Sequence, residues 1–244
     1  MSLECNQPRI QRVLHKLKRR EVTVKKIDKN SPKFISVTFY SPDLSDFVSI
    51  SFDDHVKFIF TENNNEIRRD YTPTQYSIDN NELTLKFSLH DQGKAVNWAR
   101  NAKIGDTAAI AGPRGSFVLP ADLSWQLLIG DYSAFPAIER RLSESSRDIY
   151  TIALLLVNDN YPTMDKKPNQ SIFNFLEEEQ LLETLKNLKL PEATGLCWAA
   201  GEASLMKQIK GILLGSLQQP RHLLRIGAYW RRGESEFHQD LMSQ

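Results

Sequence analysis

Arg69, Tyr71 and Thr72 stand within four residues of one another, and their side chains suit a planar ring joined to phosphate. An arginine presents a planar fork of donors that matches phosphate oxygens. A tyrosine offers a flat face to a ring, and a threonine hydroxyl hydrogen-bonds a ring nitrogen or carbonyl. The same run also fits an exposed strand with Arg69 in solvent and Tyr71 half in the core, so it needs support from elsewhere in the chain.

Two glycine-containing runs follow that arginine. His90-Asp91-Gln92-Gly93 precedes a short helical pattern, and Gly112-Pro113-Arg114-Gly115-Ser116 forms a turn. Glycines let backbone N–H groups approach phosphate closely, and a nearby helix N-terminus adds to the attraction. Together with Arg69, these runs predict a site for a large planar cofactor that carries a pyrophosphate, and we expect a flavin.

The composition is that of an ordinary soluble protein. The 244 residues are 41% hydrophobic and 25% charged, enough for one large or two small domains. A net charge of +1 excludes a general attraction to nucleic acid or membrane. No apolar run approaches the roughly 20 residues of a membrane span, and the N-terminus lacks the apolar core of a secretory signal.

The cysteines and histidines show no metal-ligand spacing. Cys5 and Cys197 lie far apart in the sequence, so we expect two free thiols in a reducing compartment. Cytoplasmic localisation and the absence of a bound metal are therefore the expectations.

The first 20 residues show a helical pattern. Ile10, Val13, Leu14 and Leu17 follow the i, i+3, i+4, i+7 spacing and predict a helix over residues 8–20. The other face of this helix is basic, and such a helix can lie on an anionic membrane or bind a partner. We favour the alternative, a terminal helix that packs on its own domain with a solvated basic face.

Short β-rich runs separated by turn residues follow, at residues 22–27, 34–39, 56–60, 71–76, 82–90 and 107–111. Only one short helix interrupts them, and its inner face carries Ala95, Trp98, Ala99 and Ala102. Many short strands with tight turns predict an antiparallel β-barrel domain over residues 1–122.

Residues 123–244 instead alternate between apolar strands and helices. Strands are expected at 125–129, 149–157, 195–200 and 223–229, and Pro136 fits the first turn of a helix. Ser171 is expected to cap a helix whose inward residues are Ile172, Phe175, Leu176, Leu182 and Leu185. Apolar strands that alternate with helices predict an α/β domain with a parallel sheet covered on both faces.

Ligands bind beyond the carboxyl ends of the strands in such a sheet. Three expected strand ends carry suitable residues, at 130–137, 201–203 and 229–232. The dinucleotide fingerprint G-x-G-x-x-G is absent, so the pattern alone leaves open whether this domain binds a nucleotide.

Nine short runs in order resemble the siderophore-interacting protein family, which comprises flavin-dependent ferric-siderophore reductases of the ferredoxin–NADP reductase superfamily. The resemblance covers nearly the whole chain and rests on residues 54–58, 69–73, 83–90, 93–99, 105–106, 112–116, 130–138, 200–203 and 229–233. It implies an FAD-binding barrel followed by a nicotinamide-nucleotide domain of a type that does not use the G-x-G-x-x-G fingerprint.

The resemblance also implies roles for individual residues. Arg69 would hold the FAD pyrophosphate, Tyr71 would stack on the isoalloxazine and Thr72 would hydrogen-bond near its reactive edge, which makes Tyr71 and Thr72 the residues nearest the chemistry. The other cofactor-binding residues implied are His90, Gly93, Ala95, Trp98, Ala99, Gly115 and Ser116 in the barrel, and Asp131, Ser133, Ala134, Gly201 and Glu202 in the second domain.

The chain departs from the family pattern at two places. Thr74 stands where the family often has a further arginine, which could shift phosphate contacts to Arg114. Ser133-Ala134-Phe135-Pro136 stands where the family usually has Thr-Ala-Leu-Pro, a chemically mild change.

The implied activity is transfer of electrons from NAD(P)H through FAD to the Fe(III) of a siderophore, which releases iron as Fe(II). A basic rim would gather anionic chelates, and its candidates are Lys57, Arg68, Arg231 and Arg232, each of which is equally well explained as solvated surface charge. NADH, NADPH and ferredoxin all stay open as donors. The alternatives are a general NAD(P)H:flavin or ferredoxin-type reductase, and a flavoprotein that binds siderophore without turnover.

Overall fold

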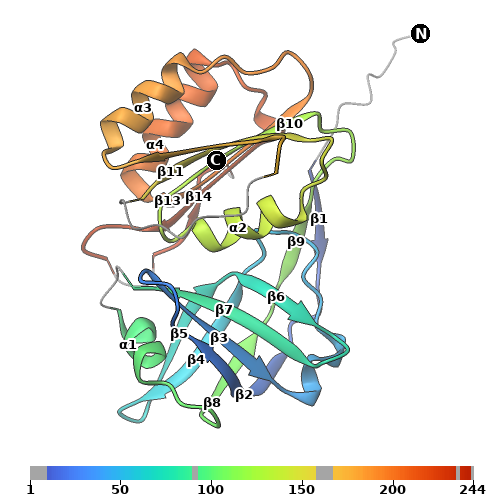
Figure 1. The fold of residues 1–244 in the computed structure, drawn as a ribbon, viewed down its shortest axis with the longest axis vertical. Helices are drawn as coiled ribbons and strands as arrows, with labels where there is room; N and C mark the ends of the chain where they lie inside the picture. Colours follow the sequence, from blue (N-terminus) through green and yellow to red (C-terminus); the bar gives the residue numbers. More distant parts are fainter. Residues whose placement is uncertain (1–9, 90–92, 158–166, 235–236, 243–244) are drawn as a thin grey trace.

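The computed structural model describes residues 10–89, 93–157, 167–234 and 237–242. Two layers of structure lie one above the other, an antiparallel barrel-like sheet below and an α/β sheet above (Figure 1). No helix among the described residues is long and apolar enough to cross a membrane.

The lower sheet contains seven antiparallel strands in the order β5-β4-β8-β2-β3-β7-β6. Alternating residues such as Val56, Phe58 and Phe60 point into a common core, which explains why these runs form strands. The strands are β2 (Arg19–Asp28), β3 (Phe34–Tyr40), β4 (Val56–Glu62), β5 (Asn65–Tyr71), β6 (Pro73–Ser77), β7 (Glu82–Ser88) and β8 (Thr107–Ala111).

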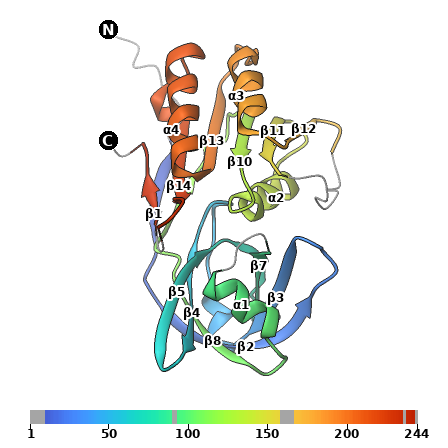
Figure 2. The ribbon, with the colours of Figure 1, turned by 90° about the vertical axis from the view of Figure 1, so that its left-hand side faces the viewer.

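The edge strands of this sheet, β5 and β6, are consecutive in sequence and are not paired with each other, so the barrel is open between them. Helix α1 (Lys94–Asn101) contacts β3, β5 and β7 beside this opening (Figure 2). The expected short helix is thus confirmed, with Ala95 and Ala99 on its buried face.

The helix expected over residues 8–20 is wrong. Gln11–Leu14 is strand β1, which pairs antiparallel with β9 (Gly115–Val118), and Arg19 already belongs to β2. All four residues of β1 are exposed, so no buried surface exists for a helical stripe to cover. Backbone pairing with β9 therefore overrides the helical spacing of the apolar residues.

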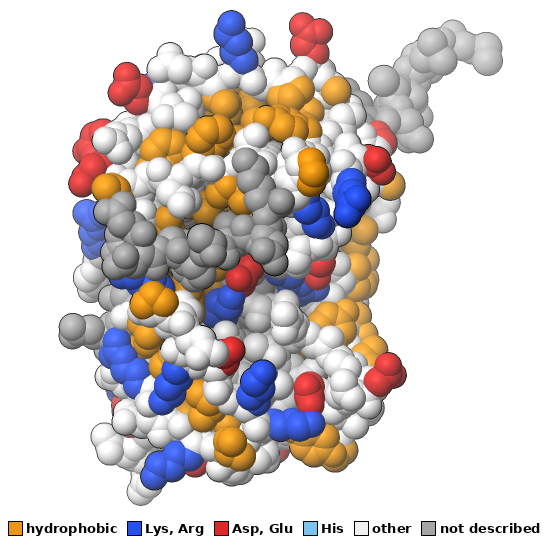
Figure 3. Space-filling model, in the orientation of Figure 1, with side chains coloured by type: hydrophobic (Ala, Val, Ile, Leu, Met, Phe, Trp, Pro, Cys, Tyr) orange, Lys and Arg blue, Asp and Glu red, His pale blue; other side chains and the backbone are white. Residues whose placement is uncertain are grey.

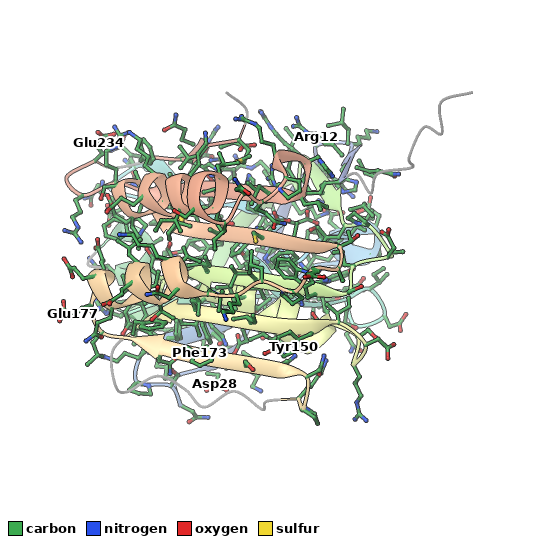
Figure 4. The ribbon with its side chains drawn as sticks, turned by 90° about the horizontal axis from the view of Figure 1, so that it is seen from above. Arg12, Asp28, Tyr150, Phe173, Glu177 and Glu234 are labelled. Atoms are coloured by element: carbon green, nitrogen blue, oxygen red, sulfur yellow. The ribbon has the colours of Figure 1, made fainter. Side chains whose placement is uncertain are left out.

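The upper sheet has the order β12-β11-β10-β13-β14-β15, parallel except for β15. Helices α3 and α4 cover its upper face and α2 lies on the face toward the barrel (Figures 1 and 4). The elements are β10 (Trp125–Gly130), α2 (Phe135–Glu144), β11 (Tyr150–Leu156), β12 (Gln170–Phe175), α3 (Glu178–Asn187), β13 (Gly195–Glu202), α4 (Ala203–Gly211), β14 (Leu224–Trp230) and β15 (Gln239–Asp240).

The α/β architecture and Pro136 in the first turn of α2 are confirmed. The helix expected to start at Ser171 is wrong, because Gln170–Phe175 is edge strand β12, paired parallel with β11. Its Phe173 is marked in Figure 4. Helix α3 begins only at Glu178, so the apparent helical spacing joined a strand to a later helix.

The two layers are fastened together by buried side chains. Arg140 of α2 donates to Ser49 Oγ (2.8 Å), Ser49 O (2.9 Å) and Pro73 O (3.1 Å) of the barrel. Trp198 Nε1 of β13 donates to Asp53 Oδ2 at 3.1 Å. Because the described residues of both layers share these polar contacts and an apolar cluster, their relative position is fixed in this structure.

Candidate functional site

Strand β5 presents Arg69 and Tyr71 on one face. Arg69 lies opposite Phe58 and Tyr71 lies opposite Val56, and both partners belong to the barrel core. The Tyr71 ring is 5.9 Å from the Phe58 ring and 4.5 Å from the Phe87 ring, centroid to centroid. Arg69 and Tyr71 are therefore directed to the inner side of β5, at the opening between β5 and β6.

Helix α1 contacts β5 and β7 beside the same opening. Its N-cap is Gly93, and its first turn carries no acidic residue. Trp98 packs with its ring 4.8 Å from that of Phe58, which holds the helix against the core. A helix N-terminus together with a guanidinium and a tyrosine ring is the donor set that a ring joined to a pyrophosphate requires, so the residues fit FAD.

Four further residues of the barrel domain are expected from the sequence to bind FAD, and their positions are as follows. Thr72 is buried between β5 and β6, and the Thr74 hydroxyl donates to the backbone oxygen of Thr84 at 3.1 Å. Ala99 is fully buried in the barrel core, so its side chain supports α1 rather than lining an open surface. His90 lies outside the described residues.

Gly115 and Ser116 belong to strand β9, which pairs with β1. Gly115 lines a cavity of about 50 Å³ between the two layers, together with His55, Trp198 and His238 among other residues. Ser116 is fully buried; its Oγ donates to Asp54 Oδ2 at 2.7 Å and lies 2.7 Å from His15 Nε2.

The turn after β8 continues into β9, which pairs with β1. The Ser116 hydroxyl is engaged by Asp54 and His15, and the phosphate cradle expected from Arg114, Gly115 and Ser116 stays a prediction.

The outer face of β5 carries Asp70, which lies 2.7 Å from Lys57 Nζ and 3.8 Å from His238 Nδ1. Burial raises the pKa of the Asp70 carboxyl, but His238 and Lys57 together outweigh burial and lower it to about 2. Asp70 therefore stays ionised at neutral pH. Its carboxylate lies between Lys57 of β4 and His238 of the C-terminal tail and links the two.

Sequence reasoning missed two members of this group. The His55 ring lies 5.2 Å from the His238 ring. His55 stands just before β4 and two residues before Lys57, and this spacing could have placed both on the same outer side of the barrel. No sequence signal indicates that His238, from the tail, reaches them.

Asp131 joins the carboxyl ends of three parallel strands. Its Oδ1 accepts hydrogen bonds from the backbone N (2.8 Å) and Oγ (2.6 Å) of Ser133, just after β10. Its Oδ2 accepts from the backbone N of Glu202 on β13 (2.9 Å) and from Nε1 of Trp230 on β14 (2.8 Å).

The chain leaves β10 for β11 on one side and returns to β13 on the other, so Asp131 lies at the point where the strand order reverses. In sheets of this kind the ligand crevice is found there. Trp230 is anchored to the end of β10 through its hydrogen bond to Asp131.

The Glu202 carboxylate is hydrogen-bonded within the protein. Its carboxylate caps α4, accepting from the backbone N of Ser204 (2.6 Å) and of Leu205 (3.1 Å). A carboxylate already placed at this helix N-terminus repels phosphate, so the end of α4 is not a phosphate site. Ala134 is fully buried beneath β10, and its side chain is not available to a cofactor.

Each of the expected rim cations has a carboxylate partner. Besides Lys57 with Asp70, Arg68 Nε lies 2.7 Å from Glu66 Oε1 and Arg232 Nη2 lies 2.6 Å from Glu178 Oε1. Arg231 pairs with Glu234 at 2.8 Å and stacks 4.1 Å above the Phe237 ring centroid. The structure thus places Lys57 close to the tail and shows Arg68 on the same outer face of the barrel, opposite Ile59.

Comparison with known proteins agrees with this geometry. Residues 23–117 match the siderophore-interacting FAD-binding domain, in two overlapping segments (23–68 and 61–117), and residues 123–233 match the siderophore-interacting protein family. The NADPH-dependent ferric-chelate reductase of Escherichia coli is 32% identical over 92% of this chain and 98% of its own length.

Solved structures show the same fold. A siderophore utilization protein from T. fusca superposes with a TM-score of 0.84 at 27% identity, covering 93% of this chain and 98% of that one. The ferredoxin reductase of carbazole 1,9a-dioxygenase shares the fold, with a TM-score of 0.63 at 17% identity over 86% of this chain and 69% of that one. The chain is a member of the siderophore-interacting protein family, with its FAD-binding domain and the fold of ferredoxin reductases.

Proposed function

We propose that this protein is an FAD-dependent ferric-siderophore reductase that takes its electrons from NADPH. The observation that carries the proposal is the placement of Arg69 and Tyr71 on the inner face of β5, with helix α1 packed against β5 and β7 at the opening of the barrel. NADPH is chosen over NADH and ferredoxin because the 32% identical relative is named an NADPH-dependent ferric-chelate reductase. A cytoplasmic location, expected from the sequence, belongs to the same proposal.

The proposal gives each part of the opening a task. Arg69 and the first N–H groups of α1 hold the pyrophosphate of FAD, Tyr71 covers one face of the ring, and Thr72 hydrogen-bonds near the ring edge. Gly93, Ala95 and Trp98 act by fixing where α1 begins. When bound, FAD supplies the conversion of a two-electron hydride donor into single electrons that Fe(III) accepts.

The second domain positions the donor. Asp131 holds the ends of β10, β13 and β14 together, and Ser133 and Gly201 border the crevice at this point. The nicotinamide nucleotide lies in that crevice, above the opening of the barrel. The residues therefore orient donor and flavin, while the cofactors carry the electrons.

The substrate is a ferric siderophore, and the rim residues gather it. Reduction of Fe(III) to Fe(II) weakens its bonds to hard oxygen donors, which frees the iron. Lys57, Arg231 and Arg232 surround the tail side of the interdomain junction and offer positive charge to anionic chelates.

Replacing Arg231 and Arg232 together by alanine is expected to raise the KM for an anionic ferric chelate about tenfold, because two attractive charges are lost and their carboxylate partners are left bare. The KM for a neutral ferric chelate should change little. Steady-state reduction of both chelates, with Fe(II) trapped by a coloured ligand, measures the difference.

The matched control is the double variant Arg147→Ala, Lys189→Ala, which removes the same charge from exposed positions near the amino ends of β11 and β13. It should leave both KM values unchanged. Equal effects of the Arg231 and Arg232 change on both chelates would contradict the assignment of the rim.

A further inference from the structure

The N-terminal segment has a surface that the reductase reaction does not use. Four aliphatic side chains there are largely exposed: Leu14 (72%), Leu17 (56%), Val48 (44%) and Ile50 (51%). Figure 3 shows hydrophobic side chains gathered along the right-hand edge of the molecule, where Figure 1 draws β1 and β9. Large aliphatic side chains exposed together mark a site of interaction.

These residues come from different parts of the chain but lie side by side. Leu14 pairs with Gly115, and the backbone N of Ile50 donates to Ser116 Oγ at 3.4 Å. Leu17 and Val48 line one groove of about 440 Å³. We call this surface, made of residues 13–18 and 46–50 with Gly112 and Pro113, the basic groove and its aliphatic rim.

The groove between the aliphatic residues is positively charged. Its lining includes Lys16, Lys18 and Arg20 against one lining carboxylate, Asp46, which pairs with both Lys18 (3.2 Å) and Arg20 (2.9 Å), so a surplus of positive charge is left. The Arg20 side chain is buried and donates to Asp43 O (2.9 Å), Gly112 O (3.2 Å) and Asp46 Oδ1 (2.9 Å), so the groove is a fixed part of the fold.

We propose that the basic groove and its aliphatic rim bind the surface of an anionic phospholipid bilayer. The cations of the groove attract lipid phosphate, and the exposed aliphatic side chains enter the boundary between headgroups and acyl chains. A second copy of the chain is a poor occupant, because two such surfaces would bring like charges together.

The orientation agrees with catalysis at the bilayer. Figure 1 draws β1 and β9 on the opposite side of the molecule from α1, and Figure 4 separates Arg12 of β1 from Glu234 beside the rim cations. A bound molecule therefore keeps the flavin opening and the rim free for donor and chelate. The proposal does not depend on the proposed function, since its test needs no turnover.

The test is co-sedimentation of the full chain with vesicles of phosphatidylcholine, with and without phosphatidylglycerol. We expect binding only to the vesicles that contain phosphatidylglycerol, and we expect it to be lost at about 0.5 M NaCl because salt screens the attraction. The variants Leu14→Ser, Leu17→Ser and, separately, Lys16→Glu, Lys18→Gln should each weaken binding about tenfold.

The matched control is Lys103→Glu, Ile104→Ser, which changes an exposed lysine and an aliphatic residue of 73% exposure at the loop before β8. This variant should bind vesicles like the unchanged protein. Thermal unfolding of every variant shows that the fold is retained.

The proposal is overturned if the unchanged protein fails to sediment with anionic vesicles at low salt, or if the control weakens binding as much as the groove variants. Light scattering tests the other occupant. A dimer that dissociates on Leu14→Ser, Leu17→Ser would assign the surface to a second copy and also overturn the proposal.

Discussion

Replacing Arg69 by alanine is expected to cost the protein most of its FAD. Hydrogen bonds between a guanidinium and phosphate are charge-assisted and contribute about 2–3 kcal/mol, so the loss weakens FAD binding roughly 30- to 150-fold. Thr74 carries no charge and its hydroxyl is bonded to Thr84 O, so it does not replace the lost guanidinium. The ratio of flavin to protein absorbance after gel filtration measures the effect.

Arg68→Ala is the matched control, because it removes the same side chain from the adjacent position. Arg68 lies opposite Ile59 on the outer face of β5 and pairs with Glu66. We expect this variant to retain flavin. Equal loss of flavin from both variants, or full occupancy in Arg69→Ala, would refute the assignment of Arg69 to the pyrophosphate.

Gly201→Ala is expected to slow reduction of the flavin by NADPH while leaving flavin occupancy intact. A Cβ at this position would lie 2.6 Å from Asp131 Oδ2 and 2.9 Å from its Cγ, closer than any real Cβ contact. The backbone φ of +154° adds strain for a residue with a side chain. Asp131 must then shift, and with it the ends of β10, β13 and β14.

A displacement of this size in the crevice that receives the nicotinamide is expected to lower the rate of flavin reduction about tenfold to a hundredfold. Anaerobic stopped-flow absorbance with NADPH measures it. Gly211→Ala is the control, since nothing lies within 4 Å of the added Cβ and α4 tolerates alanine. Unchanged reduction by Gly201→Ala would mean that the nicotinamide does not use this crevice.

The sequence predicts those elements whose periodicity matches their burial. The alternation of Val56, Phe58 and Phe60 and the apolar run of Trp125–Gly130 give strands in the structure as expected. The hydrophobic pattern gives a wrong prediction where exposed apolar residues happen to have the spacing of a buried helix face. Val13, Leu14 and Leu17 follow helical spacing, yet β1 is held by pairing with a strand that lies a hundred residues later.

The residues of the candidate site also differ in whether local sequence spacing predicts their positions. Arg69 and Tyr71 are two residues apart on one strand, so their shared face follows from local geometry. The roles expected for Ser116 and Arg114 rest on their place in a series of runs, which does not show that β9 pairs with β1. His238 reaches Asp70 only because the tail returns across the domain junction, a contact that no local spacing encodes.

An anaerobic absorbance titration tests the central claim most directly. The purified protein should show a flavin band that bleaches when NADPH is added and returns when a ferric siderophore follows, with one Fe(II) formed per electron. A flavin that NADPH reduces but a ferric siderophore does not reoxidise would contradict the proposed substrate. A colourless protein that takes up no added FAD would contradict the account of Arg69, Tyr71 and α1.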